Sequence, residues 1–335
     1  MPCDSIYTQH DGAEIRTGIR SSLIPRGNRY AALRSRALFS HEGILQEIWY
    51  GIRQFFFIEK LAYTSPKKII KKFNSIKEKL ANAGGAIHII SDKDSYSKFE
   101  ECLPKFINTI GLKSPASKLA RNEDEFKKLL LVKNEKFFPK MEIFTTSSQV
   151  GFAASVMNSS PLGTKETATE IVLAHWLSGT FLWDKIRTTG GAYGANASVN
   201  SINTCFSFAT YRDPNPLKSV DVFIESLQEA AQVMLSKEEC DKLITGTYGE
   251  EFPPMSPSTE SRIALCRILA AVSSEDQKDK LKNLLSVTPE DIKIAAERIL
   301  QNSINTKTTI IGDKALKKYA QNKSKKTSVI VKLPL

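Results

Sequence analysis

Arg187 and Tyr193 stand on either side of a glycine pair, Gly190 and Gly191, in the run LWDKIRTTGGAYGA at residues 182–195. An arginine offers a charged fork of N–H donors, and a tyrosine offers a neutral O–H donor. Donors of these two kinds suit a peptide carbonyl, or the oxyanion that develops when such a carbonyl is attacked. The same residues also fit a simpler structure, in which the glycines end a helix, the arginine faces solvent and the tyrosine packs against the fold.

Other catalytic patterns are missing from the sequence. The four histidines are far apart, and a zinc motif H-E-x-x-H beginning at His41 would need a histidine where Leu45 stands. The inverted motif H-x-x-E-H, the phosphate-binding loop and the G-x-S-x-G nucleophile turn do not occur. We therefore expect no metal ligands in this chain. We expect His88 and His175, which lie in apolar segments, to be core residues.

Cysteine usage indicates free thiols in a reducing compartment. The count of five is odd, the spacings are long and no C-x-x-C pair occurs. Zinc ligation by cysteine uses a close pair, so this pattern also argues against a cysteine zinc site. The five residues are Cys3, Cys102, Cys205, Cys240 and Cys266.

The elements that must position the glycine turn follow an α+β pattern. Residues 165–186 are apolar on nearly every side, which is typical of a helix buried between a sheet and other helices. Thr164 and Thr167 are the alternatives for its N-cap, and Asp213 followed by Pro214 predicts the start of the next helix. Strands are expected over 141–147, 150–157, 192–200, 204–211, 308–311 and 328–331, and further helices over 215–235, 237–251, 258–272 and 288–301. This order predicts an antiparallel sheet layered with helices.

The first part of the chain is predicted to be mostly helical. Ser40 is the expected N-cap of a helix that runs to Tyr63, and Pro66 begins a lysine-rich helix whose apolar residues repeat at helical spacing. A short buried strand is expected over 86–90 and a helix over 95–111.

A faint internal repeat suggests two related units. Residues 56–61 (FFIEKL) resemble residues 181–186 (FLWDKI). The polar, lysine-rich stretch 112–139 places a boundary near residue 135. The predicted fold is therefore α+β, with two tandem related units over 1–135 and 136–335, each an antiparallel-rich sheet layered with helices.

The net charge of +11 is concentrated in residues 61–140, which carry 17 basic and nine acidic side chains. Clustered lysines suit phosphate, so nucleic-acid binding is one interpretation. However, the segment has almost no arginine and no aromatic stacking array, which favours a solvated lysine face. No apolar stretch approaches the ~20 residues of a membrane span. We therefore expect neither a nucleic-acid nor a membrane partner.

The run at 182–195, taken with TYRDPN at 210–215, resembles the C-terminal half of pitrilysin/insulinase-type zinc metallopeptidases. Within that family it is most similar to the presequence protease and falcilysin branch. The segments at 40–61, 253–267 and 285–292 also fit the pattern. Such enzymes are clamshells of two halves, each built from two related α+β units of the LuxS/insulinase-like fold.

The resemblance implies a division of labour. The family's N-terminal half carries the inverted zinc motif and its glutamate base, and the zinc polarises the attacking water. The C-terminal half closes the chamber and lends an arginine and a tyrosine that hold the substrate backbone and the scissile carbonyl. By position in the motif these are Arg187 and Tyr193, with Gly190 and Gly191 as the substrate-binding turn.

This chain lacks the zinc motif, so the resemblance implies a half that is inactive alone. Its partners would be the zinc-bearing N-terminal half, where the zinc is expected, and unfolded peptides. A catalytically inactive structural or partner subunit of the same superfamily is the alternative. Whether the chain is a fragment, a split subunit or a degenerate relative stays open. The expected compartment is an organelle matrix (mitochondrion- or plastid-like) in a eukaryote, or the cytoplasm of a bacterium.

Overall fold

The computed structural model describes residues 14, 17–114, 123–131, 138–313, 316 and 328–333 of the 335-residue chain. Contacts divide the chain into two compact units. Unit 1 includes Lys60–Asn122 and Pro254–Val272, and unit 2 comprises Glu14–Glu59, Glu123–Pro253 and Ser273–Leu335. The predicted boundary near residue 135 was drawn between related, duplicated units. Contacts within one chain do not show whether two of its parts arose by duplication, so this boundary stays a prediction.

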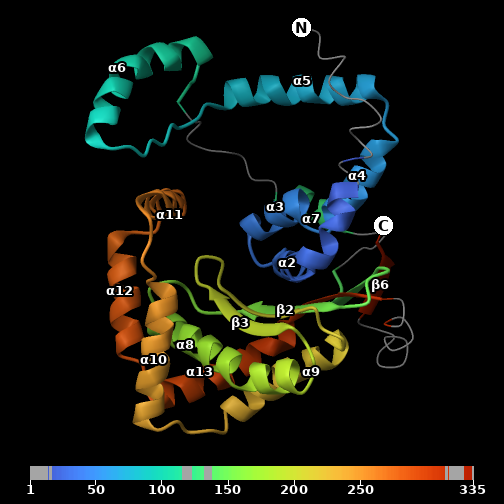
Figure 1. Cartoon of the computed structure of the whole chain (residues 1–335), viewed down its shortest axis with the longest axis vertical. Coiled ribbons are helices and arrows are strands. Elements are labelled where there is room, and N and C mark those ends of the chain that lie inside the picture. Colours follow the sequence, from blue (N-terminus) through green and yellow to red (C-terminus); the bar gives the residue numbers. More distant parts are fainter. Residues whose placement is uncertain are drawn as a thin grey trace. The chain divides into compact units, whose positions relative to one another are not determined.

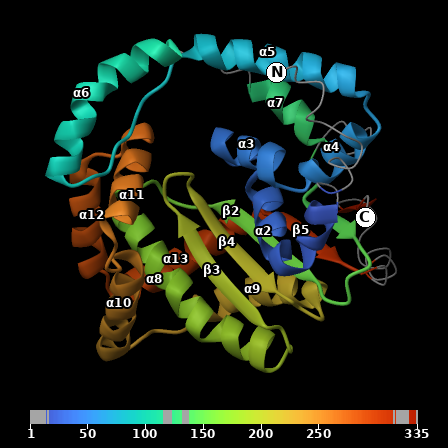
Figure 2. The same cartoon turned by 45° about the horizontal axis from the view of Figure 1, so that its top comes forward.

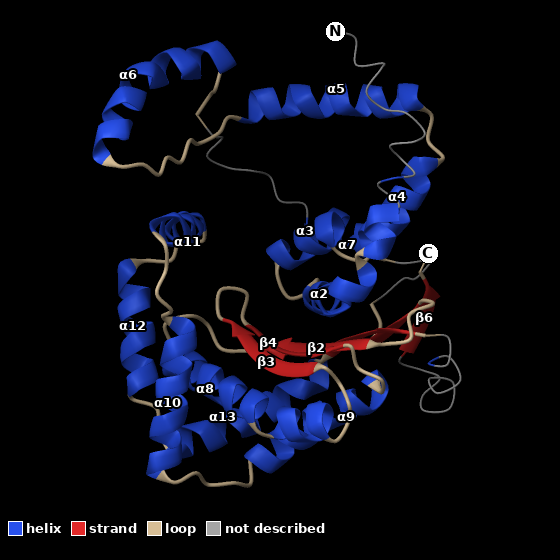
Figure 3. Ribbon diagram, viewed as in Figure 1, coloured by secondary structure: helices blue, strands red, loops and turns tan. Residues whose placement is uncertain are grey.

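Unit 2 is built on a six-stranded sheet, whose strands are red in Figure 3. The strand order is β3-β4-β2-β5-β1-β6. The pairs β3/β4, β4/β2 and β2/β5 are antiparallel, whereas β1 lies parallel to both β5 and β6. The sheet is therefore antiparallel over three of its five strand pairs, in keeping with the antiparallel-rich sheet expected, and two parallel pairs at β1 make it a mixed sheet. The strands are β1 (Met141–Thr145), β2 (Phe152–Asn158), β3 (Gly194–Asn200), β4 (Cys205–Tyr211), β5 (Lys307–Gly312) and β6 (Ser328–Lys332).

Helices cover both faces of this sheet, as Figure 1 shows, with α2 on one face and α8, α9 and α13 on the other. The central strand β2 is consequently buried on both faces over six of its seven residues. The helices of unit 2 are α2 (Leu23–Arg36), α3 (His41–Tyr50), α7 (Glu123–Leu130), α8 (Lys165–Gly179), α9 (Pro216–Ala230), α10 (Lys237–Glu251), α12 (Ser274–Leu285) and α13 (Pro289–Asn302), with a π-helix η2 (Trp183–Thr188) and a 3₁₀ turn η3 (Ser303–Asn305). Helix α4 (Arg53–Ala62) crosses the boundary between the units.

Each face of the sheet has its own apolar core. On the α8 side, Phe206 and Phe208 pack with Phe223 of α9, whose ring stacks on that of Phe208 at 4.8 Å. On the α2 side, Phe144 and Phe152 pack with Tyr30 and other α2 residues. Alternate residues of one strand thus supply different cores, as the two-residue period of a strand requires. The α+β class is confirmed.

A buried ionic cluster joins α2, α3 and β1. Arg34 donates from Nε and Nη2 to the two carboxylate oxygens of Glu142, at 2.7 and 2.6 Å, and from Nη1 to the carbonyl of Leu130. Glu47 lies 3.6 Å from Arg34 and is fully buried. Such a cluster fixes α2 and α3 on β1, because a buried arginine needs partners for its donors.

Several helix ends differ from the sequence prediction. Ser40 caps α3 as expected, but the helix stops at Gly51, whose backbone lies against the Glu47 side chain, and α4 begins afresh. Asp213 does not cap the next helix, because it forms a β-bridge with Gly151, and Asn215 takes the N-cap position of α9 instead. Helices α2, α7 and α12 were not predicted at all.

Unit 1 contains α5 (Pro66–Ala83), α6 (Lys93–Ile110) and α11 (Pro257–Leu269). The prediction of a strand over 86–90 is wrong: these residues form no regular element and pair with no described strand. His88 is accordingly exposed, not a core residue, and its Nε2 lies 3.0 Å from Ser261 Oγ. Among the described helices, none is long and apolar enough to cross a membrane.

Candidate functional site

The helix that leads to the glycine turn changes its winding before it ends. Helix α8 begins with Thr164, not Thr167, as its N-cap, and the chain then continues into the π-helix η2. The wider turn is marked by the bond from Thr189 N–H to Asp184 O, 2.9 Å long, which spans five residues. Single π-turns of this kind occur often at functional sites.

The backbone at and just after the glycine pair, Gly190 and Gly191, closes the π-helix with two hydrogen bonds. Gly191 N–H donates to Arg187 O at 3.0 Å, and Ala192 N–H donates to Ile186 O at 3.1 Å. Gly191 has φ +77°, a conformation that glycine adopts at little cost. A Cβ at Gly190 would lie 2.5 Å from the carbonyl oxygen of Ile186. Both glycines are therefore required by the turn itself, and the predicted helix-ending role is present.

The Arg187 side chain is exposed and rests on an aromatic ring. Its Cζ lies 3.8 Å from the centroid of the Trp183 ring, one turn earlier in η2. Within the described residues, no carboxylate or carbonyl accepts from its guanidinium. The donors of Arg187 are thus open to a ligand while one face of the cation is covered.

Tyr193 emerges on the far side of the turn and is 68% exposed. Its backbone N–H donates to Tyr211 O at 3.1 Å, which fixes the start of β3 against the end of β4. Its ring meets that of Tyr211 edge to face, with centroids 5.8 Å apart. The simpler sequence interpretation expected this tyrosine to pack against the fold, but most of its side chain is exposed. No described residue forms a hydrogen bond with its hydroxyl.

The segment after β4 lies next to this turn. Arg212 has φ +47°, and its guanidinium carbon lies 5.4 Å from the Tyr211 ring centroid. Asp213 is buried, and burial raises the pKa of its carboxyl, against opposing hydrogen bonds from Ser219, Asn215 and Thr210. The same segment borders a cavity of about 320 Å³ at the start of α9, but neither Arg187 nor Tyr193 lines it.

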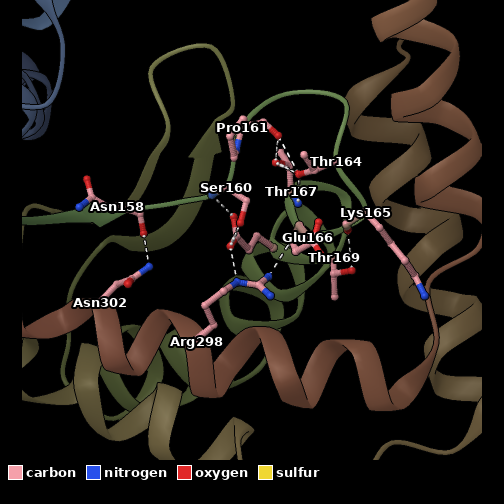
Figure 4. Close-up of polar contacts among 11 residues, drawn as sticks. Asn158, Ser160, Pro161, Thr164, Lys165, Glu166, Thr167, Thr169, Arg298 and Asn302 are labelled. Atoms are coloured by element: carbon pink, nitrogen blue, oxygen red, sulfur yellow. Dashed lines mark hydrogen bonds and ion pairs between the residues drawn. The ribbon is translucent and has the colours of Figure 1, made fainter.

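The opposite end of α8 is anchored by a polar network (Figure 4). Arg298 of α13 points toward the loop after β2, and its Nε donates to the buried carboxylate of Glu170 at 3.0 Å. The other donors to Glu170 are the N–H and hydroxyl of Ser160, both at 2.8 Å. Asn302 donates to Asn158 O at 2.9 Å. These bonds tie α8 to β2 and α13, so the turn projects from a fixed helix.

The outer edge of β3, beside the turn, is also covered. Ser178 of α8 uses its hydroxyl to bond both the N–H and the carbonyl of Ala197, at 2.8 and 3.2 Å. Figure 2 shows α8 running alongside β3. Helix α8 thereby protects the middle of an edge strand that would otherwise offer free backbone groups.

The described residues offer no ligand set for a metal ion. No group of three His, Cys, Asp or Glu side chains among the described residues is close enough to hold one. His175 is partly buried, and its Nδ1 lies 3.1 Å from a carboxylate oxygen of Glu250 on α10. Cys102, Cys205, Cys240 and Cys266 are free thiols, and burial raises the pKa of Cys205 to about 11.

Two aromatic residues of the site were not singled out from the sequence. Trp183 lies four residues before Arg187, and Tyr211 pairs with Tyr193 across β3 and β4. The signal for Trp183 is its one-turn spacing from the arginine, which places the two side chains on the same side of the helix.

Residues 141–313 match the model of a known family, described as the PreP C-terminal domain. The match takes in the whole turn, the π-helix before it and the segment after β4, and it spans more than half of the chain. The chain belongs to this family. The resemblance to presequence proteases that the sequence indicated is thus confirmed.

Relatives of the family are much longer than this chain. An uncharacterized protein of Borreliella burgdorferi is 30% identical over 290 residues, which cover 85% of this chain and 28% of that protein. Presequence protease 1, chloroplastic/mitochondrial, of Arabidopsis thaliana is 25% identical over 295 residues, or 86% of this chain and 26% of that protein. The chain therefore spans about a quarter of the length of these relatives.

A solved structure supports the fold. The crystal structure of pitrilysin superposes with a TM-score of 0.55 at 11% identity, and the match covers 98% of this chain and 34% of that one. At this identity the likeness concerns the fold alone. The chain therefore shares an α+β fold with part of pitrilysin.

Proposed function

We propose that this chain is the non-metal-binding C-terminal half of a zinc metalloendopeptidase that encloses and cleaves unfolded peptides. In this proposal it is inactive without a zinc-bearing N-terminal half. The observation that carries the proposal is the glycine-ordered turn within the matched domain. It presents the side chains of Arg187 and Tyr193 to solvent with donors that no described residue occupies.

The two side chains supply complementary donors to a peptide. Arg187 offers its planar fork to backbone carbonyls of the bound substrate. Tyr193 offers a neutral O–H to the scissile carbonyl oxygen, where negative charge develops. Gly190 and Gly191 have no side chains to hold the peptide away, so its main chain can approach the turn closely.

The zinc of the reaction belongs, in this proposal, to the other half. The described residues offer no ligand set for it. The contribution of this chain is therefore confined to binding and orienting the peptide and to stabilising charge at its carbonyl oxygen.

Mixing this chain with a zinc-bearing N-terminal half from the presequence protease family tests the proposal. We expect cleavage of a fluorogenic unfolded peptide by the mixture and none by either half alone. If the two halves form a complex that never cleaves, the chain is instead the inactive partner subunit that the sequence left as an alternative. Failure of the halves to associate at all would remove both assignments.

We also propose a reducing location for the protein. Curated relatives are named as mitochondrial or chloroplastic, and another comes from a bacterium. Four described thiols are free, which suits an organelle matrix or a bacterial cytoplasm. Thiol labelling of the native protein in cell extracts would contradict this if those cysteines proved blocked by disulfides.

A further inference from the structure

The contact between Trp183 and Arg187 has the geometry of a direct stack. A separation of 3.8 Å between Cζ and the ring centroid puts the guanidinium in van der Waals contact with the middle of the indole face. The two residues lie four positions apart in the π-helix η2, a spacing that brings side chains together on one side of a helix. Trp183 is itself 50% exposed, so it is not simply a core residue whose burial happens to place it there.

No described residue forms a hydrogen bond or an ion pair with the Arg187 side chain. Its neighbour in η2, Lys185, forms an ion pair with Glu229 of α9, but Arg187 has no such acidic partner among the described residues. A free arginine side chain loses much rotamer freedom when it is immobilised by a ligand. A ring that covers one face of the guanidinium reduces this loss and leaves the in-plane N–H groups available.

We infer that Trp183 is a positioning residue for Arg187: its ring holds the guanidinium ready to receive peptide carbonyls. This inference rests on the proposed function of Arg187 and deepens it. Removing the ring frees the arginine, so peptide binding weakens although no substrate contact is lost. The cation–π contact predicts a loss of about three- to tenfold in affinity.

Nuclear magnetic resonance of the whole ¹⁵N-labelled chain tests the stack first. The Arg187 side-chain resonance, assigned by its disappearance in Arg187→Ala, should be shifted upfield by the indole ring current. We expect Trp183→Leu to abolish this shift and Trp183→Phe to retain part of it. Trp49→Leu, at another exposed tryptophan, should leave the shift unchanged. A shift that survives Trp183→Leu overturns the inference.

A double-mutant cycle then tests the positioning role. The affinity of a fluorescein-labelled unfolded peptide is measured for Arg187→Ala, Trp183→Leu and the double variant, with melting curves to confirm folding. We expect Trp183→Leu to weaken binding in the native background and to change nothing once Arg187 is absent. An equal effect in both backgrounds would mean that Trp183 acts by another route. The native chain could show the ring-current shift while Arg187→Ala binds the peptide as tightly as the native chain does. In that case the proposed role of Arg187 fails, and the positioning role of Trp183 fails with it.

Discussion

The glycine pair determines where the arginine and tyrosine side chains leave the backbone. Gly190 has no room for a Cβ against Ile186 O, and Gly191 has a positive φ. Both constraints act on the backbone of the turn, whereas the side chains of Arg187 and Tyr193 that leave it are exposed. At the scale of single residues, the site therefore depends more on backbone geometry than on packing.

Alanine at either glycine should destabilise the protein by about 1–3 kcal/mol, the usual range for a strained backbone conformation. Gly249→Ala in α10 is the matched control, because a Cβ at this helical position would have no neighbour within 4 Å. Alanine there should be neutral or stabilising. Urea unfolding of the three variants measures the difference, and equal stability for all three would refute the role of the turn.

Buried Glu47 should make stability depend on pH. Desolvation raises the pKa of Glu47 from 4.5 to about 7, Glu142 adds to this rise, and Arg34 opposes it. The folded state therefore binds the proton more tightly than the unfolded state. The stabilising effect is full below pH 4.5 and is lost as the pH rises through the folded pKa, with a total on the order of 3 kcal/mol.

Thermal melts of the native chain and of Glu47→Gln at about pH 5 and about pH 8 measure this dependence. The glutamine variant cannot ionise, so it should lose clearly less stability between the two conditions. Parallel losses in both proteins would show that other groups cause the pH dependence.

At the scale of elements, α8 connects a buried anchor to an exposed turn. Its first turns are fixed by Glu170, Ser160 and Arg298, and its last turn covers β3 through Ser178. This hydrogen-bond network takes no direct part in the proposed peptide cleavage. It makes the helix rigid, so the turn at its far end keeps one position.

Glu170→Ala should destabilise the protein by about 2–4 kcal/mol, because it leaves Arg298 and the Ser160 N–H without their acceptor. Lys165→Ala is the control: its ion pair with Asp291 is 2.7 Å long, but its side chain is 46% exposed. That pair should be worth less than about 1 kcal/mol. Chemical unfolding compares the two, and similar losses would contradict the anchoring role.

Sequence periodicity predicted most elements of unit 2, because its strands and α8 have strong apolar patterns. It missed α12, whose residues are largely polar, and α2, which lies in a mixed, arginine-rich stretch. The strand expected at 86–90 failed because a short apolar run does not reveal whether a partner strand exists. The π-helix was beyond prediction, since residues 183–188 carry no signal that separates it from an ordinary helical turn.

At the scale of the whole molecule, the chain corresponds to one part of longer proteins. It matches a C-terminal domain family, spans about a quarter of the length of its relatives, and offers no metal ligand set among its described residues. The placement of Arg187 and Tyr193 on either side of a glycine turn was predictable from motif and spacing. The contact of Trp183 with Arg187 also had a spacing signal that was not used, whereas the contact of Tyr211 with Tyr193 depends on strand pairing and requires the fold.

The central claim is that Tyr193 stabilises charge at the scissile carbonyl. It is tested by the kcat of the reconstituted enzyme with Tyr193→Phe, which removes only the hydroxyl. We expect kcat to fall about 100-fold with little change in KM, as for the loss of an oxyanion donor. Tyr248→Phe, at an exposed tyrosine of α10, should be silent. An unchanged kcat for Tyr193→Phe would contradict the account.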